Sequence, residues 1–217
     1  IPNNKRIYTI ENGSRELDLT RVEEGKVVNS VIHTITRDSE NEKQRVDQIM
    51  LLDMALRFNP DIAVVGEMRG AEANAAQEAA RTGIAVLTTI HANSCEATYR
   101  RMVSLCKRAV DMSDETLMGY VTEAYPIIVF CKQLENKQRK MMEIMECEIL
   151  LDGTRNYRTL YQYIITENRM DENGRFFIDG YHEQKSSISE SLSKRLLENG
   201  MPLEMIYSMK RREEPFE

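Results

Sequence analysis

The stretch Asn59-Pro-Asp-Ile-Ala-Val-Val-Gly-Glu-Met-Arg-Gly70 sets a helix stop, a short strand and an acidic turn side by side. Its proline disfavours the α conformation at the residue before it, so a helix over 46–58, which has apolar residues near helical spacing, is predicted to end there. The uninterrupted apolar run 62–65 indicates a strand covered on both faces. The strand ends in a glycine followed by Glu67, so a carboxylate lies just past its terminus.

The same pattern of a strand followed by a polar residue occurs twice more. The β-branched and aromatic run 6–10 leads into Glu11, and the run 84–90 leads into His91. Strands that alternate with helices of 10 to 15 residues predict right-handed βαβ units in a parallel sheet, so the fold class is α/β. The predicted helices cover 46–58, 71–81 and about 94–108.

The second half of the chain has a different pattern, which predicts antiparallel strands followed by a small C-terminal helical region. Helix is expected after Gly180, with a final helix from Pro202. We therefore expect two domains, 1–125 and 126–217. The strand-like runs are 127–132, 141–151 and 157–166, with a further hairpin at Asn173-Gly174.

The composition is that of a folded, soluble or peripheral protein. Apolar residues make up 41% and charged residues 29%, and no apolar run approaches the length of a membrane span. The net charge of −6 argues against nucleic acid as the main partner. The charged segment 37–45 is interpreted as a solvated connection. The cysteines, which contain no C-x-x-C pair, are expected to be reduced core residues: Cys95, Cys106, Cys131 and Cys147.

Three polar residues are predicted to meet at the carboxyl edge of the sheet, where ligands bind in open α/β folds: Glu11, Glu67 and His91. Grouping them without compensation would cost several kcal/mol each, so a divalent cation or a phosphate is expected there. Glu67 could order a water on hydrated Mg²⁺ and accept its proton during attack on a γ-phosphate, which His91 could contact. Arg57 and Arg69 could bind phosphate or a neighbouring subunit, or simply pair with Asp61 or Glu72.

Three strings together resemble the motifs of the secretion ATPases, the hexameric motors of type II and type IV secretion and of type IV pilus assembly. The stretch 59–70 resembles their Walker B segment, Thr88–Ser94 (TTIHANS) their histidine box and Arg6–Asn12 (RIYTIEN) their aspartate box. The match covers roughly residues 5–110 and is closest to the branch that serves tight-adherence pili. It implies that 1–125 is part of a RecA-like ATPase core.

The resemblance also implies roles for single residues. Glu67 would be the Walker B acid near Mg²⁺ and the attacking water, Glu11 the aspartate-box acid and His91 the residue that couples the γ-phosphate to subunit movement. Glu16 is a secondary aspartate-box candidate, although Asn12 stands where the family pattern often has Asp. The implied cofactors are ATP and Mg²⁺. The implied setting is a homo-hexamer on the cytoplasmic side of the cell membrane, working with inner-membrane platform proteins.

One expected motif is missing from the chain. A Walker A loop requires G-x-x-x-x-G-K-[ST], and the nearest string, Gly25-Lys26, is followed by valine. The sequence therefore predicts a fragment that begins after the phosphate-binding helix, at the non-methionine residue Ile1, and that hydrolyses nothing alone. Two other readings stay open: a RecA-like interaction module without catalysis, and another RecA-like ATPase, one acting on nucleic acid, which the acidic charge disfavours.

Overall fold

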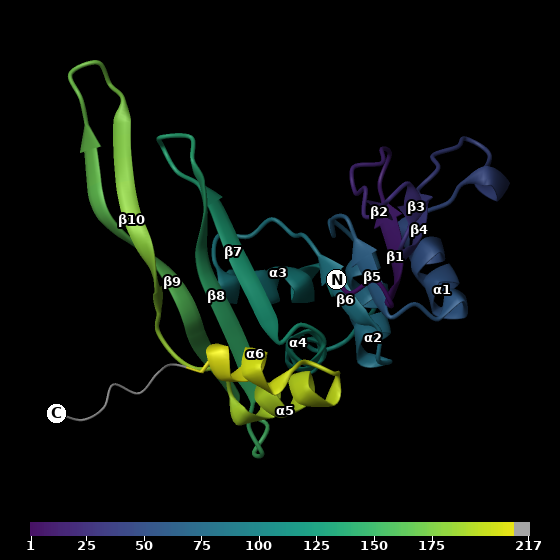
Figure 1. Ribbon diagram of the computed structural model, residues 1–217. Coiled ribbons are helices and arrows are strands. Elements are labelled where there is room, and N and C mark those ends of the chain that lie inside the picture. The colour runs from purple at the N-terminus through teal and green to yellow at the C-terminus, as the bar shows by residue number, and fades with distance from the viewer. Residues whose placement is uncertain (211–217) are drawn as a thin grey trace. The chain divides into compact units, whose positions relative to one another are not determined.

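The computed structural model describes residues 1–210 (Figure 1). The chain divides into two compact units. The first comprises Ile1–Asn93 and Ala97–Tyr125, and the second comprises Ser94–Glu96 and the chain from Pro126 onward. Each unit has its own sheet, which is parallel in the first unit and antiparallel in the second.

The first unit contains a four-stranded, fully parallel sheet in the order β4-β1-β5-β6. This confirms the predicted α/β class and the parallel pairing of the three motif-bearing strands. The outer strand β4 was not predicted, because its alternation of exposed and half-buried residues lacks the apolar run of a central strand. The strands are β1 (Arg6–Glu11), β4 (Ser30–Ile35), β5 (Ile62–Val65) and β6 (Ala85–Thr88), with a small hairpin of β2 (Val22–Glu23) and β3 (Lys26–Val27).

β1 is the most buried strand of this sheet, whereas only every second residue of β5 is buried. Tyr8 and Ile10 are fully buried, whereas in β5 the buried residues Ala63 and Val65 alternate with half-buried neighbours. The expectation that both faces of this strand are covered therefore holds fully for one face and in part for the other.

Capping residues next to the helices of the first unit help to set where these helices begin and end. Asp47 accepts a hydrogen bond from Met50 N and caps α1, and Asn59 ends this helix in the left-handed conformation at φ 45°. α2 packs against α1, α4 and β6. The helices are α1 (Gln48–Phe58), α2 (Glu72–Arg81), α3 (Cys95–Cys106) and α4 (Asp114–Ala124), with the 3₁₀ helix η1 (Glu42–Gln44) inside the charged segment.

The second unit is an antiparallel meander in the order β10-β9-β8-β7, followed by two short helices (Figure 1). The antiparallel strands and the C-terminal helices are as predicted. The strands are β7 (Ile127–Gln133), β8 (Arg139–Ile149), β9 (Arg155–Met170) and β10 (Phe176–Gln184), and the helices are α5 (Glu190–Glu198) and α6 (Leu203–Ser208).

Gly180 lies inside β10, so the expected change to helix after it is wrong. The glycine sits at a bulge opposite Ile165, where a Cβ atom would lie 2.1 Å from Ile164 O. A residue with a side chain cannot approach the neighbouring strand so closely, and the strand continues to Gln184.

The second unit is held together by an apolar cluster and a buried acid. Leu160 of β9 packs with Ile188, Leu192 and Ile206 of the helical region. Glu146 of β8 is 1% exposed. Its Oε2 accepts from Ser189 N at 2.9 Å, and its Oε1 accepts from Ser189 Oγ. Because Ser189 is the N-cap of α5, the acid fixes the start of that helix.

The cysteine expectation holds for three of the four residues. Cys95, Cys106 and Cys147 are buried and free, but Cys131 of β7 is exposed. Burial raises the pKa of Cys95 to about 12 and that of Cys106 to about 11, so both thiols stay protonated. No helix within residues 1–210 is long and apolar enough to cross a membrane.

Candidate active site

The parallel register brings the three predicted strand ends to one edge of the first sheet. Ile10, Val65 and Thr88 are aligned across β1, β5 and β6. Glu11 closes β1, whereas Glu67 and His91 lie in the loops that leave β5 and β6. Residues that are far apart in the sequence thus converge because each strand ends at the same level.

Glu67 lies between two basic side chains. Arg69 Nη2 is 2.5 Å from its Oε2, and His91 Nε2 is 3.1 Å from its Oε1. The hydrogen bond from Arg69 holds the pKa of Glu67 below its ordinary value, and the charges of Arg69 and His91 act in the same direction. The acid is therefore ionised at neutral pH, while the His91 side chain, which is 90% exposed, is free to turn.

Glu11 is more deeply buried, at 3% exposure, and it organises the loop that follows it. Its Oε1 accepts hydrogen bonds from Glu16 N at 2.6 Å and Leu17 N at 2.8 Å. The Glu16 side chain accepts from Ser14 Oγ at 3.3 Å. The structure thus gives Glu16 a main-chain contact with Glu11 that sequence spacing alone did not suggest.

A pocket of about 390 Å³ gathers most of the predicted site residues. Glu11, Glu16, Glu67 and Arg69 line it, and His91 approaches it through its contact with Glu67. Its remaining lining is Asn12, Ser14, Leu17, Gln48, Gly66 and Thr89.

Arg57, unlike His91, neither lines this pocket nor forms an ion pair with a predicted site residue within residues 1–210. It lies on the exposed surface in the last turn of α1. The suggested pairs with Asp61 and Glu72 are replaced by other contacts: Asp61 pairs with Lys5 and Arg6, and Glu72 accepts from main-chain amides. Hydrogen bonds from Arg6 hold the pKa of Asp61 below its usual range.

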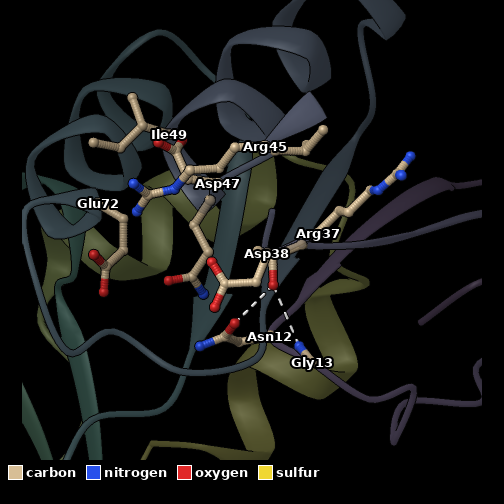
Figure 2. Close-up of a pocket in the computed structure, with 11 residues that line it drawn as sticks. Asn12, Gly13, Arg37, Asp38, Arg45, Asp47, Ile49 and Glu72 are labelled. Carbon is tan, nitrogen blue, oxygen red and sulfur yellow. Dashed lines mark hydrogen bonds between the residues drawn. The ribbon is translucent and has the colours of Figure 1, made fainter. Parts of the chain in front are cut away.

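A second pocket of about 400 Å³ lies beside the first, and Figure 2 shows its lining. The charged segment interpreted as a plain connection contributes Arg37, Asp38 and Arg45 to it. Thr36 Oγ1 donates to Asn12 Oδ1 at 2.7 Å and accepts from Gly13 N at 3.3 Å, the dashed lines in Figure 2. Asn12 and Gln48 line both pockets, so the pockets adjoin at these two amides.

The turn that carries Glu67 has supporting residues that the sequence did not reveal. Glu72 Oε1 accepts from Arg69 N at 2.5 Å and from Gly70 N at 2.7 Å. A Cβ at position 70 would lie 2.9 Å from Glu72 Oε2, so the glycine permits this approach. The only local signal for this contact is an acid two residues after a glycine, which many loops share.

The acidic side chains suit a hydrated cation that is shared with phosphate. Among the described residues, the buried Glu11 Oε2 has no hydrogen-bond partner, and the buried Glu67 Oε1 contacts only the exposed ring of His91. Mg²⁺ is bound typically by one or two carboxylates together with waters and substrate phosphates. No group of three metal-ligating side chains occurs within residues 1–210. The residues present therefore fit Mg²⁺ held by ATP and water, with Glu67 and Glu11 as the acids beside it.

The fold and this site define a class: a RecA-like α/β protein with acids and a histidine at the carboxyl edge of its parallel sheet. Within that class, the chain belongs to the type II/IV secretion system protein family, whose family model matches residues 1–200.

Individual relatives match shorter parts of the chain. The uncharacterized protein MJ1287 of Methanocaldococcus jannaschii is 46% identical over 61 residues, 28% of this chain and 23% of that protein. The type IV pilus assembly ATPase PilB of Pseudomonas aeruginosa is 32% identical over 91 residues, 42% of this chain and 16% of PilB. The chain thus spans less than a quarter of either relative.

Among solved structures, the VirB11 ATPase of the Brucella suis type IV secretion system, crystallised with sulphate, has the same fold. It superposes with a TM-score of 0.55 at 22% identity, over 67% of this chain and 41% of that one. The likeness supports the RecA-like architecture described above.

Proposed function

We propose that the chain is the C-terminal part of a hexameric ATP-hydrolysing motor for bacterial pilus assembly or protein secretion, and that 1–125 is part of its ATPase core. The observation that carries this proposal is the pocket in which Glu11 keeps a buried carboxylate oxygen without a partner among the described residues, and in which the buried Glu67 Oε1 contacts only the exposed ring of His91. Membership of the secretion family and the similarity to PilB support it. The three motifs are closest to the tight-adherence branch, which we propose as its setting.

In this mechanism Glu67 positions the attacking water and accepts its proton. Its lowered pKa keeps it ionised, so its Oε1 can accept a hydrogen bond from water when the exposed His91 ring turns away. Glu11 is anchored through Oε1 by two main-chain amides, so its Oε2 would be the oxygen that contacts the water beside Glu67. When bound, Mg²⁺ would neutralise the developing charge on the phosphates. Glu16 and Arg69 line the pocket and add an acidic and a basic side chain to it.

His91 is proposed to link the nucleotide to subunit movement. Its ring is almost fully exposed but touches Glu67 Oε1 at 3.1 Å, so it can exchange that contact for a γ-phosphate oxygen. Arg69 can likewise exchange Glu67 for phosphate, because its guanidinium is 70% exposed. For Arg57, the exposed position favours contact with a neighbouring subunit.

The chain alone is expected not to hydrolyse ATP, because it holds no string that forms a phosphate-binding loop. The test is to add ATP and Mg²⁺ to the 217-residue chain and to measure heat of binding and phosphate release. Tight binding or turnover would contradict this part of the proposal.

The proposed partners follow from the same family membership. The intact protein is expected to form a homo-hexamer, and to bind inner-membrane platform proteins from the cytoplasmic side. Light scattering of the intact protein with a non-hydrolysable ATP analogue tests the hexamer, and a monomer under these conditions would count against it.

A non-catalytic interaction module is the second candidate. It is favoured by the ion pair of Glu67 with Arg69 and by the amides on Glu11, which satisfy one oxygen of each acid without any nucleotide. The coding sequence upstream of Ile1 separates the two functions: a GKT or GKS loop supports the motor, and its absence supports the module.

A further inference from the structure

The turn that carries Glu67 is held by side chains from three separate segments of the chain. Each of them donates a hydrogen bond to a different main-chain carbonyl of the turn. The three contacts are Thr89 Oγ1 to Gly66 O at 2.6 Å, Gln48 Nε2 to Glu67 O at 3.1 Å and Arg108 Nη1 to Arg69 O at 3.0 Å. The backbone of the turn is thus fixed at three of its carbonyl groups.

This support matters because the neighbours of the Glu67 carboxylate are themselves loosely held. The side chains of Arg69 and His91 are 70% and 90% exposed, so neither can fix the acid from the solvent side. The main chain has to set the position of the carboxylate. Of the three donors, only Gln48 bonds to Glu67 itself.

Gln48 also has a particular place in the fold. It is the first residue of α1, directly after the charged segment that lines the second pocket, and it lines both pockets. A conformational change in the second pocket can therefore be transmitted to Glu67 through the side chain of Gln48.

We propose that Gln48 is a positioning residue for Glu67, and that it ties the placement of the acid to the start of α1. The inference rests on the proposed catalytic role of Glu67. Reactions between bound groups are sensitive to small displacements, and a misplacement of about 1 Å can cost on the order of 10²-fold in rate.

The first test is structural and uses the 217-residue chain. Gln48→Glu keeps the shape, but an ionised carboxylate cannot donate and would face the Glu67 carbonyl. Gln48→Leu removes the donor without adding charge. Gln44→Glu is the matched control, because it makes the same change of charge at an exposed residue of η1 whose side chain accepts a hydrogen bond from Arg37, which a carboxylate can also accept.

Amide NMR signals of residues 66–70 are the readout. Both Gln48 variants should shift these signals and speed their hydrogen exchange, with the strands of the sheet unchanged, and Gln44→Glu should not. Unchanged signals of 66–70 in both Gln48 variants would overturn the proposal.

The second test uses the intact protein and measures ATP hydrolysis. Gln48→Leu should lower kcat on the order of tenfold and leave KM for ATP within about twofold, because the residue acts through Glu67 and not on the nucleotide. An unchanged kcat, in a protein that Glu67→Gln inactivates, would overturn the positioning role. If Glu67→Gln leaves hydrolysis intact, the proposed function fails, and the NMR result alone decides whether Gln48 positions the turn.

Discussion

Both units of this protein bury a carboxylate, but they treat it differently. In the second unit, Glu146 has both oxygens satisfied by the amide and hydroxyl of Ser189. In the first unit, Glu11 keeps one buried oxygen without a partner among the described residues, and the buried Glu67 Oε1 contacts only the exposed ring of His91. A buried unsatisfied group costs about 1–3 kcal/mol. Among these carboxylates, Glu11 bears this cost at the pocket, whereas Glu146 avoids it, and this contrast separates an acid of the site from a structural anchor.

The largest expected effect is on the chemistry of the first unit. Glu67→Gln in the intact protein should lower ATP hydrolysis by about 10²–10³-fold, because the amide cannot accept the proton of water. The thermal unfolding temperature should hardly change. Steady-state phosphate release checks this result, with Glu42→Gln, an exposed acid of η1, as the matched control. Unimpaired hydrolysis would reject the catalytic assignment of Glu67.

The second unit should show the opposite response. Glu146→Ala leaves the Ser189 amide and hydroxyl without their acceptor and should destabilise the fold by about 3 kcal/mol. Urea unfolding of the 217-residue chain measures the loss. Glu172→Ala, an exposed acid in the turn between β9 and β10, serves as the control. A loss no greater than that of the control would mean that Glu146 anchors nothing.

Glu11 has one oxygen bonded to main-chain amides and one oxygen without a partner among the described residues. Its variants should therefore separate a structural role from a catalytic one. Glu11→Gln keeps an oxygen for the amides of Glu16 and Leu17 but replaces the unpartnered oxygen with a donor. Hydrolysis by the intact protein should fall about tenfold, with stability within about 1 kcal/mol of the parent. Glu11→Ala should lose stability as well. Equal stability of the two variants in urea would show that the loop does not depend on the carboxylate.

The smallest effect concerns pH. Arg69 lowers the pKa of Glu67 through a hydrogen bond, so this pair stabilises the fold above the unfolded pKa of the acid and stops doing so as pH falls through the lowered one. Arg69→Met should raise the pKa of Glu67, and the difference in stability between variant and parent should vanish in acid. Carbon NMR titration of the carboxyl group measures the shift, and an unmoved pKa would refute the pairing in solution.

Much of the fold could be predicted where the signal is local. The strand 62–65, its proline-terminated helix and the acid that follows were visible as short patterns, and the parallel sheet followed from their alternation. β4 was missed because an edge strand need not carry an apolar run. α4 was missed because Gly119 interrupts it and weakens its helical signal. The change to helix was expected too early, after Gly180, since only the neighbouring strand shows why a glycine is needed inside β10.

The candidate site likewise has a part that local sequence signals predict and a part that only tertiary contacts show. The sequence alone determined which residues reach the carboxyl edge of the sheet, since Glu11, Glu67 and His91 are set by the ends of their strands. Only the tertiary structure decided which carboxylate oxygens stay unpaired, that Gln48 supports Glu67 from 19 positions away, and that Ser189 satisfies Glu146 across 43. The physical reason is that strand ends follow from backbone preferences of neighbouring residues, whereas the partner of a buried polar group depends on how distant segments pack.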